Sequence, residues 1–339
     1  MKKTKAAIIG CGNIAGWLEY DRYLEKPFSH IGAYRSRKDI EVVACADNDL
    51  SKAEKFVRYF KVPFFTDSID ELLRQRADLV SICVPYRFNE SVIKEICRHK
   101  NKPKVLFLEK PISNNLKGAQ SIVDYCKRNR VKLYVNNRRL APLYQAVRQL
   151  VDKKFRNEVL SACVWCSSGM HAIGIHMVDL IRYLLGEVKS VSVEREMVRV
   201  TRLPYSHNFD HTDVRFSGII KMKSGVPVGF LNSAMTDYTF FELEIILKRG
   251  RIKVSNYGHK EKLVYQVKGK TNSSPLSHVL GKEQLVKVQG KPLFKAIIDD
   301  IMDGSYSESP VRGEEGLKSY KIIDAMMKSA KTGKEQFIN

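Results

Sequence analysis

The chain has 339 residues, more than the roughly 250 to 300 at which a single hydrophobic core stops growing, so we expect two domains. Apolar residues make up 44% and charged residues 28%, which is a globular composition and excludes disordered and collagen-like classes. No apolar run approaches the ~18 residues that a membrane-spanning helix needs, so no membrane partner is expected.

The net charge is +21, from 58 Lys and Arg against 37 Asp and Glu. The excess occurs in both parts of the chain: residues 1–140 contain 28 basic and 16 acidic residues, and the remainder contains 30 and 21. Because no tail or block carries it, we interpret the excess first as a general compositional property. An anionic substrate such as a sugar nucleotide comes second, and a nucleic-acid partner is disfavoured.

The first residues resemble a secretory signal only superficially. The apolar run that follows the basic start, residues 6–9, already ends at Gly10, so we expect a short strand that enters a glycine turn. Seven scattered cysteines, an odd number, predict reduced thiols in a cytoplasmic protein. Cys163 and Cys166 form one C-x-x-C, but residues three apart in a strand face opposite sides, so no metal site is expected there.

The first 140 residues alternate β-rich runs with helical patterns, which predicts an α/β fold with a doubly wound parallel sheet of the Rossmann type. The expected strands are residues 6–9, 41–46, 79–84, 105–108 and 132–135. The expected helices are residues 49–60, 69–76, 89–98 and 116–128. Expected capping residues are Asp49 for the first helix, Asn89 or Ser91 for the third, and Asn114 or Asn115 for the fourth.

After about residue 140 the pattern changes to consecutive strands, which indicates a C-terminal α+β domain with a large, mostly antiparallel open sheet. Its expected strands are residues 159–166, 190–200, 213–222, 226–236, 241–248 and 250–254. Its expected helices are residues 142–151, 175–185, 293–302 and 315–330. We place the domains at residues 1–138 and 139–339, with the closing helices free to pack back on the first domain.

The strongest local signal is a G-x-G-x-x-A motif directly after the first expected strand. The first glycine allows a tight turn, the second lets the backbone approach a pyrophosphate, and the small third residue lets a helix pack on the strand. The phosphates are expected at the N-terminus of the helix that follows. The motif supplies the cofactor-binding candidates Gly10, Gly12, Asn13, Ile14 and Ala15.

Asp47 ends the second expected strand, where an acidic side chain accepts hydrogen bonds from the adenosine ribose, and Asn48 beside it is a further candidate contact. Gly12 and Asp47 are 35 residues apart, against a usual ~20, so we expect an insertion around residues 17–29. Because an aspartate repels a 2′-phosphate, NAD is favoured over NADP as cofactor.

A second motif is Glu109-Lys110-Pro111, at the end of an expected strand, where open α/β sheets bind ligands. The proline biases Lys110 towards an extended conformation that can turn its ammonium into the cleft. A lysine desolvated beside a cationic nicotinamide is expected to have a lowered pKa, which suits it to bind a substrate hydroxyl or accept its proton.

A third element spans residues 174–186. His176 and Asp179 are three residues apart on an expected helix and share a face, with Tyr183 one turn further along. Imidazole is the usual acid or base near neutral pH, so His176 is a candidate to exchange the substrate's hydroxyl proton. Taken alone, such a histidine is more often structural.

These three elements, with Asn137-Arg138-Arg139, occur in the order of the Gfo/Idh/MocA oxidoreductases, which the chain resembles over essentially its whole length. The resemblance implies hydride transfer between nicotinamide and a sugar, cyclitol or sugar-nucleotide carbon, in carbohydrate or surface-polysaccharide metabolism. It also implies a C-terminal sheet that forms homodimers or homotetramers. It assigns Lys110 and His176 as catalytic residues. Further cofactor contacts are expected from Cys83, Pro85, Asn89, Glu109 and Lys110, and candidate substrate or proton-relay residues are His171, Asp179, Tyr86 and Arg138.

One departure from the family pattern concerns Ala172, where many family dehydrogenases carry an aspartate four residues before the histidine. His171 is a candidate to take over part of that role. Asn89 likewise stands where relatives often place a histidine. The departure leaves two alternatives open: a catalytically silent NAD-binding sensor of the same fold, and a reductase for a non-sugar carbonyl or a tetrapyrrole.

A metal site is considered at His207, Asp210 and His211, where two imidazoles are four residues apart. The stretch shows no helical apolar period, so we interpret it as a polar loop and expect no metal cofactor.

Overall fold

The structure is a computed structural model, and it describes residues 3–201, 210–233, 236, 238–257, 260–269 and 280–338. The chain forms two compact units. The first comprises Met1–Ala141 and Lys291–Tyr320, and the second comprises Pro142–Gly290 and Lys321–Asn339. The first unit thus includes a late segment beyond the boundary expected at residue 138, in the region of the closing helices that were expected to be free to pack back on the first domain.

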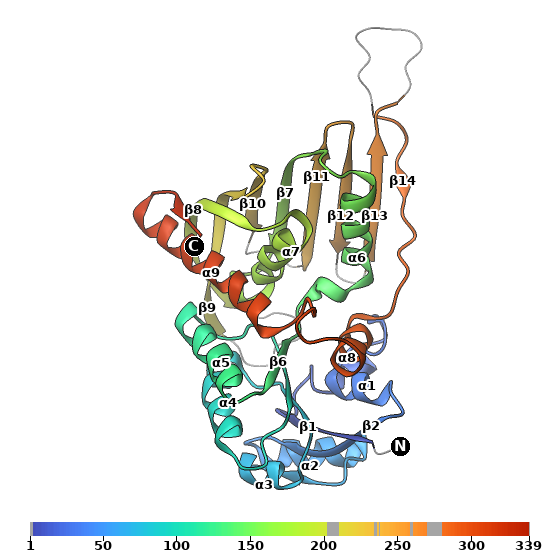
Figure 1. Ribbon diagram of the computed structural model, residues 1–339, viewed down its shortest axis with the longest axis vertical. Coiled ribbons are helices and arrows are strands. Elements are labelled where there is room, and N and C mark those ends of the chain that lie inside the picture. The colour runs from blue at the N-terminus through green and yellow to red at the C-terminus, as the bar shows by residue number, and fades with distance from the viewer. Residues whose placement is uncertain are drawn as a thin grey trace. The chain divides into compact units, whose positions relative to one another are not determined.

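The first unit is built on a six-stranded sheet in the order β3-β2-β1-β4-β5-β6, in which neighbouring strands are parallel (Figure 1). Its strands are β1 (Thr4–Ile9), β2 (Ile40–Ala46), β3 (Phe65–Thr66), β4 (Leu79–Ile82), β5 (Val105–Leu108) and β6 (Lys132–Val135). The strand order reverses between β1 and β4, as in dinucleotide-binding Rossmann folds. The predicted Rossmann sheet is confirmed, with β3 as an additional two-residue strand.

The helices of this sheet are α1 (His30–Arg35), α2 (Leu50–Phe60), α3 (Ile69–Arg74), α4 (Asn89–Arg98) and α5 (Leu116–Arg128). Asp49 caps α2 by accepting from two backbone N–H groups, and Asn115 caps α5 by accepting from the N–H of Gly118. The predicted cap of α4 by Asn89 or Ser91 was wrong, because α4 begins at Asn89 itself and no side chain caps it.

The helix expected directly after the glycine turn is interrupted. Residues 13–16 form a turn, η1 (Trp17–Tyr20) is a 3-10 helix, and α1 begins only at His30. The N–H groups of His30 and Ile31 donate to the carbonyls of Ile14 and Ala15, at 3.1 and 3.0 Å. Helix α1 therefore continues the turn as though residues 17–29 had been inserted into one helix.

Helix α8 (Leu293–Asp303) belongs to the first unit because its apolar face joins that unit's core. Phe294, Ile297 and Ile298 are buried in the same cluster as Ile8 and Phe107. Burial of several large apolar side chains contributes several kcal/mol, at about 1.5 to 3 kcal/mol each, which explains why this late segment packs on the Rossmann sheet.

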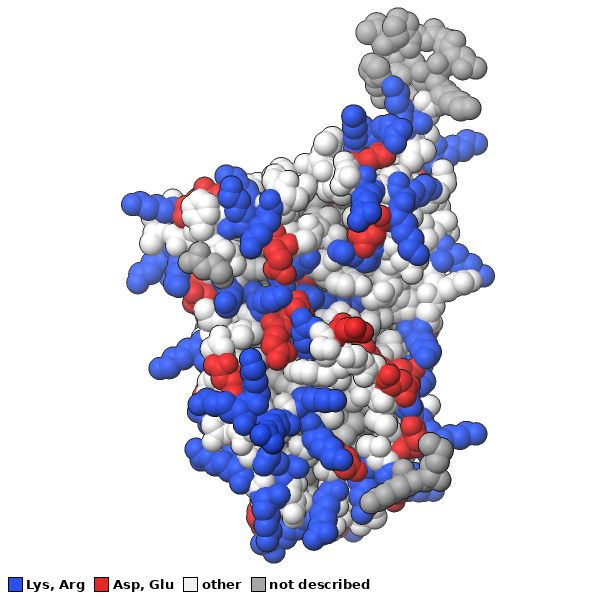
Figure 2. Space-filling model, viewed as in Figure 1, with Lys and Arg blue, Asp and Glu red and all other residues white. Residues whose placement is uncertain are grey.

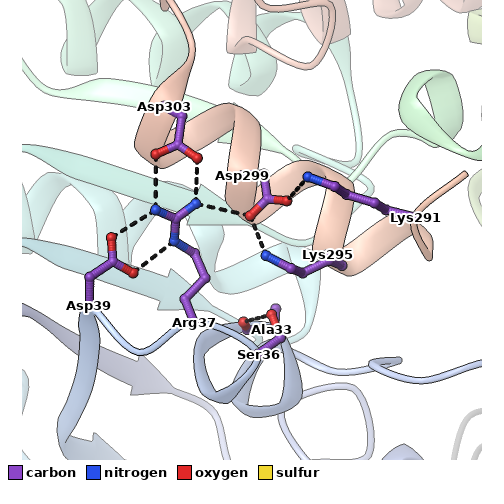
Figure 3. A network of polar contacts seen from close by, with 8 residues as sticks. All are labelled: Ala33, Ser36, Arg37, Asp39, Lys291, Lys295, Asp299 and Asp303. Carbon is purple, nitrogen blue, oxygen red and sulfur yellow. Dashed lines mark hydrogen bonds and ion pairs between the residues drawn. The ribbon is translucent and has the colours of Figure 1, made fainter.

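Ion pairs centred on Arg37 hold α8 to the loop after α1 (Figure 3). The Arg37 guanidinium pairs with Asp39 at 2.7 Å, Asp299 at 2.9 Å and Asp303 at 2.5 Å. Asp299 also accepts from two lysines, Lys291 and Lys295. Burial by itself would raise the pKa of Asp299, but these three cations lower it to about 2.

The second unit contains a nine-stranded sheet in the order β14-β13-β12-β11-β7-β10-β9-β8-β15. Its strands are β7 (Val159–Ser167), β8 (Val188–Thr201), β9 (Asp210–Met222), β10 (Pro227–Ser233), β11 (Phe240–Leu247), β12 (Gly250–Tyr257), β13 (Lys260–Val267), β14 (Gln284–Leu285) and β15 (Gln336–Phe337). Strands β7 and β10 are parallel and the other neighbours are antiparallel. The predicted mostly antiparallel sheet is confirmed, and β13, β14 and β15 extend it beyond the expected strands.

Helical segments of this unit are α6 (Pro142–Gln149), the π-helical turns η4 (Leu150–Lys154) and η5 (Met170–Gly174), and α7 (Ile175–Leu185). Helices α6 and α7 lie over one face of the sheet (Figure 1). Helix α9 (Gly313–Thr332) starts in the first unit and ends in the second.

Lys and Arg are spread over the face shown in Figure 2, with Asp and Glu among them, and they do not form a single stripe. Among the residues that the structure describes, no helix combines the length and the apolar character needed to cross a membrane.

Candidate active site

The carboxyl ends of the parallel strands bring predicted cofactor residues of the first unit to one edge of the sheet. Gly10 follows β1, Asp47 follows β2, Cys83 follows β4, and Lys110 lies two residues after β5. Open α/β sheets bind ligands at this edge, next to the point where the strand order reverses. That point lies between β1 and β4, so Gly10 and Cys83 flank it.

The two glycines of the turn differ in whether the fold itself requires them. Gly10 has φ +91°, and a Cβ there would lie 2.7 Å from the carbonyl carbon and oxygen of Cys83, so the protein itself requires glycine. Gly12 is exposed and has no positive φ, and a Cβ there would meet nothing within 4 Å. The fold leaves position 12 open, which fits a pyrophosphate lying against the backbone.

Asp47 is held beside this turn by backbone donors. Its Oδ2 accepts from the N–H of Cys11 at 2.8 Å, and its Oδ1 accepts from the N–H of Asp49 at 3.0 Å. Asp47 is half-buried, whereas Asn48 and Asn13 are exposed. Each carboxylate oxygen has two lone pairs, so Asp47 can still accept hydrogen bonds from ribose hydroxyls.

Lys110 is half-buried on a loop that Asn89 holds in place. The Asn89 side chain is buried, and its Nδ2 donates to the carbonyls of Pro111 at 3.1 Å and Ile112 at 3.0 Å. The peptide bond between Lys110 and Pro111 is cis. This geometry gives Asn89 the role of shaping the loop, and its contact with a cofactor stays a prediction.

Glu109 ends a buried chain of polar side chains. Its Oε1 accepts from His30 Nε2 at 2.8 Å and from Asn136 Nδ2 at 2.7 Å. His30 Nδ1 lies 2.7 Å from Ser81 Oγ, which also contacts the Tyr34 hydroxyl. His30, Ser81 and Tyr34 have no exposed surface. Glu109 is thus held in place by buried side chains. One of them is His30, the first residue of α1, which directly follows the insertion.

The other predicted residues of this unit follow the same strands. Pro85 and Tyr86 follow β4, with Tyr86 half-buried at the start of η2 (Tyr86–Phe88). Arg138 follows β6 and is half-buried in η3 (Arg138–Leu140). Their roles in binding stay predictions.

In the second unit, His176 and Asp179 both lie on α7 as predicted. His176 is in the first turn and is 8% exposed. Asp179 is 1% exposed, and its Oδ1 lies 3.8 Å from the guanidinium of Arg182, which also pairs with Glu187 at 2.9 Å. Asp179 is therefore engaged by a cation of its own helix, and its part in a proton relay stays a prediction.

His171 lies in η5 and pairs with a carboxylate that the sequence did not identify. Its Nδ1 is 2.7 Å from Oδ1 of Asp213 on β9. The two residues are 42 positions apart, and no local spacing links a turn before a helix to a strand of the sheet. His30 was missed for the same reason, since it begins α1 and its partner Glu109 follows β5, 79 positions away.

The described residues contain no group of three or more His, Cys, Asp or Glu that could hold a metal ion. Of the stretch considered for a metal, His207 lies outside the described residues, and only the backbone of Asp210 and His211 is described. All seven cysteines have free thiols, and on β7 Cys166 is buried whereas Cys163 is partly exposed.

Two family models match this chain. The model of an oxidoreductase family with an NAD-binding Rossmann fold matches residues 4–137, and the model of that family's C-terminal alpha/beta domain matches residues 167–336. The chain belongs to the Gfo/Idh/MocA oxidoreductase family. The first unit is its NAD-binding domain, so the predicted family and the predicted NAD cofactor are both confirmed.

Curated relatives from this family include sugar dehydrogenases. D-glucoside 3-dehydrogenase of Escherichia coli is 27% identical over 215 residues, which cover 56% of each chain. D-apiose dehydrogenase of Paraburkholderia graminis is 25% identical over 217 residues, covering 58% of this chain and 54% of that one. The matches thus span only about half the length of these relatives.

Several solved structures share the fold over almost the whole chain. The WlbA dehydrogenase of Bordetella pertussis, in complex with NADH and UDP-GlcNAcA, has a TM-score of 0.73 at 18% identity and covers 100% of this chain and 99% of its own. An oxidoreductase of Agrobacterium radiobacter, in complex with NAD+, L-tartaric acid and magnesium, has a TM-score of 0.72 at 18% identity, with 99% of both chains covered. At these identities the likeness concerns the fold alone.

Proposed function

We propose that this family member is an NAD-dependent oxidoreductase that interconverts a hydroxyl and a keto group on a sugar, cyclitol or sugar nucleotide. The observation that carries the proposal is the edge of the first sheet, where an open glycine turn, a fixed Asp47 and Lys110 follow the parallel strands β1, β2 and β5. The sugar class is supported by curated relatives that include a glucoside and an apiose dehydrogenase. A bound nicotinamide would supply the hydride acceptor or donor.

In this proposal, residues of the chain bind the cofactor and the substrate. The backbone at Gly12 receives the pyrophosphate, and Asp47 receives the adenosine ribose and disfavours a 2′-phosphate, which selects NAD. Lys110 binds the reacting oxygen, and His176 is the second group assigned to the substrate. The basic surface would assist a phosphorylated or nucleotide-linked substrate by attracting its charge.

The test measures NADH formation from NAD+ with methyl D-glucoside, D-apiose and UDP-GlcNAcA. The wild type is compared with Lys110→Ala and with a matched control, Lys132→Ala, which removes an exposed lysine at the opposite, amino end of a strand. We expect Lys110→Ala to lose at least about 100-fold in rate while the control keeps its rate. Equal rates in the two variants would refute the role of Lys110. NADH binding without turnover of any substrate would instead favour the sensor alternative.

We also propose that the nine-stranded sheet mediates a homo-oligomer. Strand register places Ile219, Leu231 and Ile246 on one face of the sheet, together with Trp165. These three aliphatic side chains are 43%, 40% and 38% exposed, and apolar side chains exposed on one sheet face support an interface with a second copy of the chain. Light scattering should show a dimer or tetramer for the wild type and a smaller species for Leu231→Lys. A monomeric wild type would contradict this proposal.

We also infer that the protein functions in a reducing compartment such as the cytoplasm. The seven cysteines are all unpaired, and burial raises the pKa of the Cys166 thiol to about 12, so this thiol stays protonated at neutral pH.

A further inference from the structure

His30 connects two parts of the first unit that are far apart in the sequence, the glycine turn and Glu109. We propose that His30 is a positioning residue for the dinucleotide: it holds Glu109 so that the second oxygen of the Glu109 carboxylate binds the nicotinamide half. The proposal rests on the NAD-dependent function proposed above, and none of the three sequence motifs contains His30. All the residues involved belong to the first unit.

Glu109 lies on the side of the sheet edge where the nicotinamide half is expected. Its N–H donates to the carbonyl of Ile82, the last residue of β4, at 3.0 Å. In a doubly wound sheet the dinucleotide spans the point where the strand order reverses, with one mononucleotide on each side. Asp47 follows β2 on one side of that point, so the adenosine half belongs there. The nicotinamide half then belongs beyond β4, at the end of β5, which Glu109 follows.

The two oxygens of the Glu109 carboxylate differ in their surroundings. Oε1 accepts from His30 Nε2 at 2.8 Å and from Asn136 Nδ2 at 2.7 Å. Within the described residues, no hydrogen bond is made to Oε2. The Glu109 side chain is 11% exposed, so the carboxylate is largely enclosed but still reaches the surface. Because a carboxylate oxygen accepts hydrogen bonds and donates none, Oε2 can bind a hydroxyl or amide donor, and the nicotinamide half carries both.

The hydrogen bonds of the His30 ring run in one direction. A carboxylate only accepts, so His30 Nε2 carries the proton that binds Glu109. In the neutral ring Nδ1 is an acceptor, and Ser81 Oγ lies 2.7 Å from it. Ser81 in turn contacts the hydroxyl of Tyr34, whose pKa is raised by burial, so this hydroxyl keeps its proton and can donate. The chain from Tyr34 through Ser81 to His30 therefore presents one N–H to Glu109.

The His30 ring is also fixed by packing. It has no exposed surface, and its centroid lies 4.3 Å from the ring of Phe107 on β5 and 5.4 Å from the ring of Phe294 on α8. Both ring nitrogens are hydrogen-bonded as well, so a rotation of the ring would break two buried hydrogen bonds. The direction from which Glu109 receives its hydrogen bond is therefore fixed.

The backbone of His30 is joined to the glycine turn. Its N–H donates at 3.1 Å to the carbonyl of Ile14, within that turn. Glu19 closes the insertion beside it, because Glu19 Oε1 accepts from the N–H of Phe28 and from Ser29 Oγ, both at 2.7 Å. His30 thus connects the turn proposed for the pyrophosphate with the carboxylate that follows β5. Fixing this spacing before the cofactor binds reduces the entropy cost of binding.

Asn136 offers a second, independent way to disturb Glu109. Its Nδ2 donates the other hydrogen bond to Oε1, whereas its own Oδ1 is buried and has no hydrogen-bond partner among the described residues. Replacing Asn136 by leucine, a side chain of similar size, removes one hydrogen bond to Glu109 together with one buried unpaired acceptor. Because these two effects on stability oppose each other, we expect Asn136→Leu to fold.

The test measures the Kd of the full chain for NADH and for ADP by isothermal titration calorimetry. ADP contains the adenosine and the pyrophosphate of NADH but lacks the nicotinamide half. We expect His30→Leu and Asn136→Leu to bind NADH roughly tenfold more weakly, because Glu109 is no longer held in position, while the Kd for ADP stays within about twofold. His30→Gln, whose amide can place an N–H near the position of Nε2, should recover most of the affinity for NADH.

Two control variants separate positioning from stability. Ile298→Ala removes apolar packing from the same core but no side-chain hydrogen bond, so it should lower the thermal stability without changing the ratio of the two Kd values. His99→Leu removes a histidine whose Nε2 lies 3.1 Å from Oδ1 of Asp70, away from Glu109, and it should leave both Kd values unchanged. A purely structural role of His30 would change the Kd values for NADH and ADP by the same factor.

The ratio of the two Kd values decides the outcome. Equal weakening of NADH and ADP binding in His30→Leu, an unchanged Kd for NADH, or a His30→Gln variant that binds no better than His30→Leu would overturn the proposal. If His30→Leu does not fold, an unchanged ratio in Asn136→Leu would overturn it. A wild type that binds NADH but oxidises none of the three sugar substrates would refute the proposed dehydrogenase function, and the same ratio would still decide the role of His30.

Discussion

Replacing Gly12 by alanine should separate the cofactor from the fold. A Cβ at this position would meet no protein atom within 4 Å, and its backbone is not in the left-handed region. The substitution should therefore leave the fold intact or stabilise it by about 0.4 to 1 kcal/mol, because alanine reduces the entropy of the unfolded chain. The same methyl group would occupy the space that the proposal gives to the pyrophosphate.

The expected loss of affinity follows from the contact that is removed. A hydrogen bond from a backbone N–H to a charged phosphate contributes about 1.5 to 3 kcal/mol. At about 1.4 kcal/mol per tenfold, the Kd for NADH should rise by roughly 10- to 150-fold in Gly12→Ala. Gly10→Ala is the contrasting variant: its positive φ costs about 1 to 2 kcal/mol, and the 2.7 Å approach to Cys83 adds to that.

The assay is a fluorescence titration with NADH beside urea unfolding of the same samples. Gly12→Ala should show normal unfolding and weak binding, whereas Gly10→Ala should show reduced stability. An unchanged Kd in Gly12→Ala would mean that no phosphate lies against this turn, and the reasoning from the open space at Gly12 would be refuted.

Three further predictions concern charge, buried polarity and packing. Asp299→Asn should cost about 2 kcal/mol at pH 7, since the carboxyl's pKa falls from 3.8 to about 2 at about 1.36 kcal/mol per unit. Because the pKa of Asp299 is lowered, its ionised carboxylate stabilises the folded protein fully above pH 3.8, and this stabilisation is lost as the pH falls towards 2. The unfolding free energies of wild type and Asp299→Asn, measured in urea, should therefore differ less at pH 3 than at pH 7. A difference that does not change with pH would contradict the ion-pair origin. His30→Leu removes one donor from the buried Glu109 carboxylate and should lower the unfolding free energy by about 1 to 3 kcal/mol; unchanged urea denaturation would show that this hydrogen bond contributes nothing. Gly169→Ala must displace the Asp213 carboxylate that binds His171 and should lower the unfolding free energy by about 1 to 3 kcal/mol; unchanged urea denaturation would show that the packing around Gly169 accommodates the added methyl group.

The local sequence pattern predicted most of the strands and helices, because the residues within each of these elements specify it. The alternation of apolar runs and helical periods placed β1, β2, β4, β5 and β6 in a parallel sheet, and the long strands after residue 140 in an antiparallel one. The two-residue strands β3, β14 and β15 were missed because two residues carry no periodicity.

Part of the candidate site could likewise be predicted from the sequence, and part could not. Short contiguous motifs predicted four parts of the candidate site: the glycine turn, Asp47, Lys110 and His176. Partners that meet across the fold leave no such signal. No residue near Glu109 in the sequence predicts its contact with the buried His30. Likewise, no residue near His171 predicts its pairing with Asp213, 42 positions away.

The sequence by itself determined a dinucleotide-binding turn, since short-range spacing encodes it, while the chain length predicted two domains and the order of several motifs predicted the oxidoreductase family. Only the tertiary structure decided that α8 joins the Rossmann core, that residues 17–29 interrupt a helix, and that a strand carboxylate orients His171. These features depend on contacts between distant segments, and such contacts arise from burial and hydrogen bonding in three dimensions, which a linear spacing does not record.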